Sequence, residues 1–173
     1  SSTTVSEAYH YEDSSTGQIL VLGNLDGSTN HQEMTVSYRY DDRSGKLITA
    51  WGQGTFESND GFGNITRGSI VQTYQVINGQ AKIAVSTTIS DAYHYENILV
   101  GGTGFEEVEI RKRQIFSGNL DGSTSHQEMT VRYEYDKNGK LVNARGQGTF
   151  ESNDGFGNIT KGFIAQTYQI ING

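Results

Sequence analysis

Apolar and polar residues alternate with a period of two along much of the chain. Residues 34–40 place Met34, Val36, Tyr38 and Tyr40 at alternate positions, and residues 129–135 repeat this order of residue types. Because neighbouring residues of a strand point to opposite faces, the pattern predicts strands with one face towards a core. The 22 glycines, the absence of proline and the lack of any long helical period are typical of strands joined by tight turns. The sequence therefore predicts an all-β, antiparallel fold.

The chain carries an internal duplication with a period of roughly 95 residues. Residues 52–66 return unchanged as residues 146–160, and residues 23–36 return as 118–131 with one replacement. This period is too long for a solenoid repeat and suits half of a closed β architecture. We therefore predict a single domain over residues 1–173, built from repeat one (1–79) and repeat two (80–173), with a hairpin turn at Asn78-Gly79.

The differences between the repeats separate the two faces of the strands. Ser37 and Arg39 are replaced in repeat two by Arg132 and Glu134, whereas the alternating Met, Val and Tyr residues are kept. We predict that the first set faces water and that the second faces a core. Trp51, which becomes Arg145, is predicted to be partly exposed.

The ends of the chain indicate how the sheet is completed. Residues 2–5 resemble residues 86–89, and Gly173 corresponds to Gly79. We predict about ten antiparallel strands in a closed or nearly closed barrel with pseudo-two-fold symmetry, in which the N-terminal strand lies beside the C-terminal one. A two-sheet β-sandwich is the alternative. Repeat two is longer by about 11 residues, which predicts a rim hairpin near residues 97–117.

Composition excludes several classes of function. A net charge of -7 and a pI near 5.0 do not suit a nucleic-acid partner, because phosphates are neutralised by clustered Lys and Arg. The chain has no cysteine, so it offers neither disulfides nor thiolate metal sites. No apolar run approaches the ~18 residues of a membrane span, and the given chain shows no signal peptide. We expect a soluble, metal-independent protein without a cofactor, in an undetermined compartment.

The unchanged segment contains the strongest candidate binding site. Its glycines permit positive φ, its Asn and Asp side chains supply donors and acceptors, and its phenyl ring offers a face for stacking. Sugars require this chemistry, so we predict a non-enzymatic, lectin-like protein that binds carbohydrate or another small polar ligand once per repeat. The alternative is a turn that satisfies its own Asx hydrogen bonds. The predicted ligand-binding residues are Asn59, Asp60, Gly61, Phe62 and Asn64 in repeat one, and Asn153, Asp154, Gly155, Phe156 and Asn158 in repeat two.

A second function is indicated by retained polar aromatic residues. A His two positions from a Glu can move a proton near neutral pH, although a structural, hydrogen-bonded His is the alternative. Gln72 and Tyr74 would make a polar cavity if they point inward. The Gly-x-Gly-x-Phe of residues 52–56, followed by Gly-x-Gly at 61–63, resembles the barrel repeats of the allene-oxide-cyclase and dirigent group, which implies a lumen that folds a reactive small molecule. This hypothesis is a cofactor-free cyclase or isomerase that uses His10, His94, Glu12, Glu96, Tyr74 and Tyr168.

Two further possibilities concern metal and assembly. His31 and Glu33 share a strand face, but a metal site needs a third ligand at suitable spacing, so we predict no metal. A structural or assembly protein is the third class of function, and an oligomer is compatible with the sequence.

Overall fold

A computed structural model describes residues 1–14, 17–99 and 111–170, and every regular element in these ranges is a β-strand. The predicted all-β class is confirmed. The strands are β1 (Ser2–Glu7), β2 (Tyr9–Ser14), β3 (Gly17–Leu22), β4 (Thr29–Tyr40), β5 (Leu47–Asn59), β6 (Asn64–Ile77), β7 (Gln80–Leu99), β8 (Arg111–Ser117), β9 (Thr124–Tyr135), β10 (Leu141–Asn153) and β11 (Ile159–Thr167).

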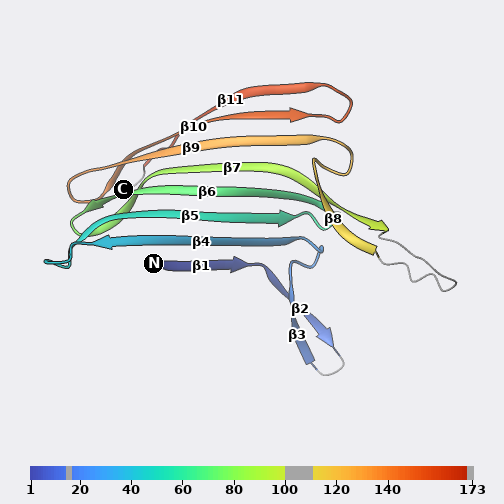
Figure 1. Cartoon of the computed structure of the whole chain (residues 1–173), viewed down its shortest axis with the longest axis horizontal. Helices are drawn as coiled ribbons and strands as arrows, with labels where there is room; N and C mark the ends of the chain where they lie inside the picture. The colour runs from blue at the N-terminus through green and yellow to red at the C-terminus, as the bar shows by residue number, and fades with distance from the viewer. Residues whose placement is uncertain (15–16, 100–110, 171–173) are drawn as a thin grey trace.

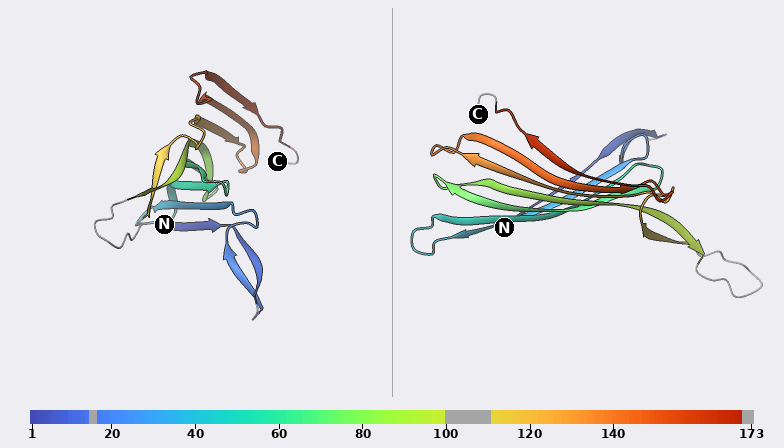
Figure 2. Two further views of the ribbon diagram at one scale, coloured as in Figure 1. Left: turned by 90° about the vertical axis from the view of Figure 1, so that its right-hand side faces the viewer. Right: turned by 90° about the horizontal axis from the view of Figure 1, so that it is seen from above.

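The strands form one large antiparallel sheet and a small hairpin. The nine-stranded sheet runs in the order β1-β4-β5-β6-β7-β9-β10-β11, with β8 paired to β7, and β2 pairs with β3 alone (Figure 1). β1 and β11 stand at the two ends of this order, so the sheet is open and the predicted closure is not confirmed (Figure 2). The division into a nine-stranded and a two-stranded sheet is compatible with the two-sheet alternative.

The two repeats follow one another within the large sheet. Ser2 of β1 pairs with Val36, as Ser86 of β7 pairs with Val131. Repeat one supplies β1, β4, β5 and β6, and repeat two supplies β7, β9, β10 and β11, so the ladder between β6 and β7 joins the repeats. Repeat two therefore extends the sheet of repeat one by four strands in this order, and β8, paired to β7, is the ninth strand of the sheet.

The turn between β6 and β7 is the predicted Asn-Gly hairpin. Asn78 has φ 52° and Gly79 has φ 80°, between the strand ends at Ile77 and Gln80. Two successive positive φ angles match the right-handed twist of the flanking strands, and Asn and Gly adopt them most easily. The prediction is confirmed, and this turn fixes the register of the joint between the repeats.

A second hairpin recurs in both repeats. β2 and β3 pair Tyr9 with Leu22, and the last part of β7 pairs Tyr93 with Ser117 of β8. The predicted rim hairpin near 97–117 includes the paired ends of β7 and β8. Its extra segment, at residues 100–110, lies outside the described residues.

Little of the sheet is buried. Among the described residues, the buried apolar side chains are Ala50, Ile65, Ala92 and Ala144. The chain exposes 12259 Å² of accessible surface, whereas a folded protein of 19.0 kDa exposes about 8,400 Å². The large sheet therefore leaves much of its surface open to solvent.

The predicted alternation of faces is clear on β9, where Val131 is half-buried and Arg132 is exposed. It is not seen on β4, where Ser37, predicted to face water, is half-buried. Met34 and Val36 are half-buried, and Trp51 is 48% exposed, which confirms its predicted partial exposure. Tyr38 and Tyr40, which were predicted to face a core, are 38% and 54% exposed. Their counterparts Tyr133 and Tyr135 are half-buried beside β7, whereas the β1–β4 ladder reaches only Ser2 opposite Val36 and leaves Tyr38 and Tyr40 uncovered.

The most buried large side chain has a matched partner for a stability test. Ile65 on β6 is 1% exposed because β7 covers it, whereas its counterpart Ile159 on β11 is 57% exposed. In dilute protein, we expect Ile65→Ala to lower the free energy of unfolding by about 2–4 kcal/mol and Ile159→Ala by less than about 1 kcal/mol. Urea denaturation measures both values, and equal losses would contradict the described difference in burial.

Candidate functional site

The two predicted binding turns lie at the same end of the sheet. The turn between β5 and β6 spans residues 59–64, and its counterpart between β10 and β11 spans residues 153–158. Both lie at the right-hand end in Figure 1. A second turn, which precedes β4 or β9, packs against each of them. We call residues 24–28 with 59–64 the first turn pair, and residues 119–123 with 153–158 the second turn pair.

An aspartate at the centre of each binding turn holds its backbone. Asp60 Oδ1 accepts hydrogen bonds from the amides of Phe62 (2.7 Å) and Asn64 (3.1 Å), and its Oδ2 accepts one from Asn64 Nδ2 (2.7 Å). Asp154 accepts the same bonds from Phe156 and Asn158 at 2.8, 3.1 and 2.6 Å. The Asp and Asn side chains thus form the self-contained Asx turn that was the alternative interpretation.

These hydrogen bonds shift the acidity of both aspartates. Burial alone would raise the pKa of Asp60, but hydrogen bonds from the Asn64 side chain and the Phe62 amide outweigh it and lower the pKa. Hydrogen bonds from the Asn158 side chain and then the Phe156 amide lower the pKa of Asp154. Both carboxylates are therefore ionised at neutral pH, and their charge stabilises the turns.

Glycine is required where the two turns of a pair meet. Gly61 has φ 83°, and a Cβ atom there would lie 2.7 Å from the carbonyl oxygen of Asp26. Gly155 has φ 82° and the same distance to Asp121. Only glycine combines this backbone conformation with so close an approach. The neighbouring turn was not predicted as part of the site, although its unchanged sequence in both repeats was a signal for it.

Each turn pair presents apolar side chains to solvent. Phe62 and Phe156 are 80% and 90% exposed, and Leu25 and Leu120 are 81% and 51% exposed. Loops held by a rigid scaffold often carry binding residues, so these exposed side chains are candidate contact residues. The structure therefore brings the predicted Asn, Asp, Gly and Phe residues of each repeat together on one turn, and Leu120 of the second turn pair lies beside Gly63 and Asn64 of the first.

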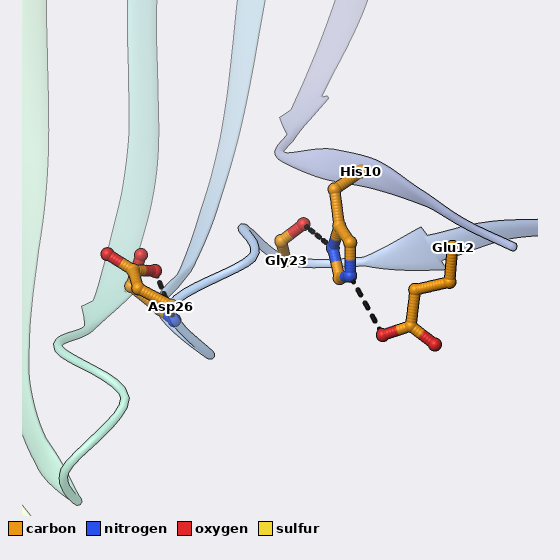
Figure 3. Close-up of polar contacts among 5 residues, drawn as sticks. His10, Glu12, Gly23 and Asp26 are labelled. Carbon is orange, nitrogen blue, oxygen red and sulfur yellow. Dashed lines mark hydrogen bonds and ion pairs between the residues drawn. The ribbon is translucent and has the colours of Figure 1, made fainter.

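His10 and His94, which occupy equivalent positions in the two repeats, have structural roles. His10 Nδ1 lies 2.7 Å from the carbonyl oxygen of Gly23, and its Nε2 lies 3.1 Å from Glu12 Oε1 (Figure 3). His94 has the same geometry with Gly118 and Glu96. The Gly23 carbonyl and then Glu12 raise the pKa of His10, and the Gly118 carbonyl leads the rise in the pKa of His94. Each histidine thus connects its strand, β2 or β7, to the glycine that precedes the turn at residues 24–28 or 119–123.

The residues predicted for a cyclase do not form one site. On β7, His94 lies opposite Asn64, whereas Tyr74 of β6 lies opposite Ile83. These positions are 11 residues apart on β7, which corresponds to roughly 36 Å at about 3.3 Å per residue. Tyr74 instead donates a hydrogen bond to Gln72 Oε1 (2.8 Å), and Tyr168 donates one to Gln166 Oε1 (2.6 Å). Burial, followed by the neighbouring Tyr38, raises the pKa of Tyr74.

The remaining histidines each pair with a carboxylate. His31 Nδ1 lies 3.0 Å from Glu7 Oε1, and His126 Nδ1 lies 2.6 Å from Asp91 Oδ1. Within residues 1–14, 17–99 and 111–170, no three His, Asp or Glu side chains lie close enough to hold a metal ion. These pairs connect neighbouring strands.

Two hollows on the sheet lie away from the turn pairs. A hollow of about 830 Å³ on repeat two is lined by residues that include Thr130, Arg132, Arg145 and Phe163. A smaller one of about 410 Å³ occupies the corresponding place on repeat one, with Thr35, Gln53 and Val71. None of the predicted site residues lines either hollow.

Comparisons of the chain with protein-family models, curated proteins and solved structures gave no match. In the part of the chain that the structure describes, no helix is long and apolar enough to cross a membrane.

The two central aspartates predict a loss of stability in acid. A carboxylate whose pKa is lowered by folding stabilises the fold above its unfolded pKa of about 3.9, and this stabilisation disappears as the pH falls through the lower folded value. We expect the melting temperature to fall below about pH 4, and to fall less in the double variant Asp60→Asn with Asp154→Asn.

Thermal melts between pH 6 and pH 2.5 measure this difference. Asp42→Asn is the control, because it removes a carboxylate from the β4–β5 hairpin at the other end of the sheet. An unchanged acid profile in the double variant would show that the two turns do not contribute.

Proposed function

We propose that the protein is a non-enzymatic binding protein that takes carbohydrate, or a similar polyhydroxyl ligand, at the two turn pairs. The observation that supports this function best is the phenyl ring at the tip of each binding turn. Phe62 and Phe156 are exposed, yet the turns that carry them are fixed by the same hydrogen bonds in both repeats. An aromatic side chain on a fixed backbone has few rotatable bonds and loses little conformational entropy when a ligand stacks on it.

The polar groups around the ring suit hydroxyl groups. The Asp60 carboxylate accepts hydrogen bonds from the Phe62 amide and from the amide and side chain of Asn64, and the Gly63 amide also acts on it, so its role is to hold the turn. Asn59 Oδ1 accepts the Gly61 amide at 2.8 Å, which orients its side-chain amide as a donor. Acceptors and donors beside an aromatic face are the groups that a sugar ring requires.

Two turn pairs at one end of the sheet favour a multivalent ligand. Both turn pairs lie at the end where β5 runs into β6 and β10 into β11 (Figure 1). Two linked sites raise the apparent affinity for a multivalent surface by two or more orders of magnitude without new contacts. This suits a glycan surface better than a single small molecule.

The cyclase alternative depends on a lumen, and the closed barrel that would provide one stays a prediction. Closure within one chain would place β1 beside β11, and these strands are not paired in the open sheet. The separation of His94 from Tyr74 along β7 also gives this alternative no common site. We therefore favour binding over catalysis.

Removal of the phenyl rings tests the proposal. Because both rings are exposed, Phe62→Ala and Phe156→Ala should leave the melting temperature nearly unchanged. We expect each single variant to halve the stoichiometry in calorimetry with a glycan first identified on an array, and the double variant to lose binding.

The control is the double variant Ile48→Ala with Val142→Ala, which removes two exposed apolar side chains at the start of β5 and β10. It should bind as the unmodified protein does. The proposal fails if no glycan binds, or if the phenylalanine double variant binds with unchanged stoichiometry and affinity.

A further inference from the structure

We propose that β11 of one copy of this chain pairs with β1 of a second copy, in the register that β6 and β7 use between the repeats. This interaction goes beyond the proposed binding function and does not depend on it. β1 and β11 each pair with one described strand, β4 and β10 respectively, so each leaves one edge of backbone groups open. Open edges of this kind readily take up another strand.

The internal duplication shows which strand fits each open edge. β6 of repeat one corresponds to β11 of repeat two, and the part of β7 that pairs with β6 corresponds to β1. Gln72 pairs with Ser86, and Val71 pairs with Thr87. The corresponding residues place Gln166 opposite Ser2, and Ala165 opposite Thr3. The joint between the repeats is therefore a template for a joint between two copies.

Residues on the open side of β11 lack neighbours that their counterparts have. Ile65 is 1% exposed beneath β7, and Ile159 is 57% exposed. Asn64 Oδ1 accepts a hydrogen bond from the Leu120 amide at 3.0 Å. Asn158 Oδ1 has no such partner among the described residues, although Asn158 Nδ2 bonds Asp154 as Asn64 Nδ2 bonds Asp60. In both comparisons, the residue of repeat one is covered by a strand or turn of repeat two, and no described strand or turn covers its counterpart on β11.

The missing neighbours correspond to residues at the other end of the same chain. The counterpart of Leu120 is Leu25, which is 81% exposed, against 51% for Leu120. A Cβ atom on Gly63 would meet the Leu120 side chain at 3.2 Å, whereas one on Gly157 would meet nothing within 4 Å. A second copy in the template register would bring its Leu25 to Gly157 and to Asn158 Oδ1.

The tyrosine hydroxyl that bonds a glutamate in the internal joint also has a counterpart at the open edges. Tyr95 of β7 donates a hydrogen bond to Glu57 Oε1 (3.1 Å), and Glu57 also binds Arg67 (2.5 Å). On β10 and β11, Glu151 binds Lys161 (2.9 Å), and the counterpart of Tyr95 is Tyr11, which is 65% exposed. The second copy would supply Tyr11 to Glu151.

Charge and apolar pairing agree with the template. Arg67 lies directly opposite Asp91 in the internal joint. The same register places Lys161 opposite Glu7, again a cation opposite an anion. It also places Phe163, which is 90% exposed, opposite Val5, which is 56% exposed. Opposite charges and apolar pairs directly across antiparallel strands stabilise a sheet.

The ladder register favours a second copy over closure within one chain. The residue opposite Ser2 on β4, the residue opposite that one on β5, and so on across the sheet form a row that ends at Gln166 on β11. In the template register, Gln166 in turn lies opposite Ser2, so within one chain the row would close on the residue where it began. A barrel closed in this way would have no stagger between its strands. Twisted strands close only when they tilt and stagger, on the order of eight residues for eight strands. The template register therefore suits an added copy, and closure in one chain needs another register.

The resulting interface is head-to-tail. A dimer would bury one β1 edge and one β11 edge and leave the other two open, so association continues beyond two copies unless a ring closes. Each added copy would also extend the row of turn pairs along one end of the sheet.

Cysteine cross-linking tests the register, because the chain has no cysteine of its own. Chains with Thr3→Cys are mixed with chains carrying Ala165→Cys and oxidised mildly. Directly opposite residues have Cβ atoms about 4.5–5.5 Å apart, so we expect a disulfide-linked heterodimer. Lys161→Cys replaces Ala165→Cys in the offset control, which moves the thiol by roughly 13 Å and should give at least about tenfold less product.

Two further variants define the outcomes. Val71→Cys with Thr87→Cys in one chain is the internal standard, because these residues are paired across β6 and β7. Ser6→Cys with Ile170→Cys in one chain reports barrel closure with a stagger of about eight residues. The proposal is overturned if this closure pair forms a disulfide within a monomer. It is likewise overturned if Thr3→Cys and Ala165→Cys, placed together in one chain, form a disulfide within a monomer. It is also overturned if the internal standard links while the mixed chains do not.

Association without a cross-link provides an independent measurement. We expect the sedimentation coefficient to rise with protein concentration, and Lys161→Glu or Phe163→Ser to shift this rise to about 2–5-fold higher concentration. Phe163→Ser installs the residue that β6 carries at position 69, and so leaves the strand pattern intact. A single sedimenting species of monomer mass at all concentrations would contradict the proposal.

Discussion

Backbone pairing between neighbouring strands is the interaction on which the rest of this structure depends. Among the described residues, the buried apolar side chains are three alanines and one isoleucine, so side-chain packing contributes less than in a layered domain. The ladders are long, and β6 and β7 alone pair from Asn64 with His94 to Ile77 with Gln80. Because the ladder sets which residues lie opposite one another, it also determines which side chains are covered. Ile65 is buried and Ile159 is exposed for this reason alone.

The candidate site depends on the same ladders through its turns. The pairing of Asn59 with Ile65 ends the β5–β6 ladder and leaves residues 60–64 to close a turn around the Asp60 carboxylate. The preceding turn at residues 24–28 is positioned by the start of β4 and approaches so closely that only Gly61 fits. A rigid platform for an exposed phenyl ring follows from backbone geometry and a few charged hydrogen bonds, without a packed core beneath it.

The sequence predicts the local features of this protein better than the arrangement of its edges. The Asn78-Gly79 hairpin and the exposure of Trp51 follow from turn chemistry and from the period of two. The likeness of residues 2–5 to residues 86–89 correctly indicates equivalent strands, but it shows only which edge would fit β11 and not whether that edge comes from the same chain. The turn at residues 24–28 was missed as part of the site because its contact with Gly61 arises only in three dimensions.

The central claim is that each repeat adds to the sheet in one register, within the chain and between chains. Hydrogen exchange measured over a range of protein concentrations tests it most directly, with amides of residues 163–166 compared with their counterparts at 69–72. We expect residues 69–72 to be protected at every concentration, because β6 lies between two strands. In residues 163–166, alternate amides bond β10, and we expect the amides on the open edge to gain protection as the concentration rises. Concentration-independent protection of these open-edge amides would contradict the account, as would its absence at the highest concentration.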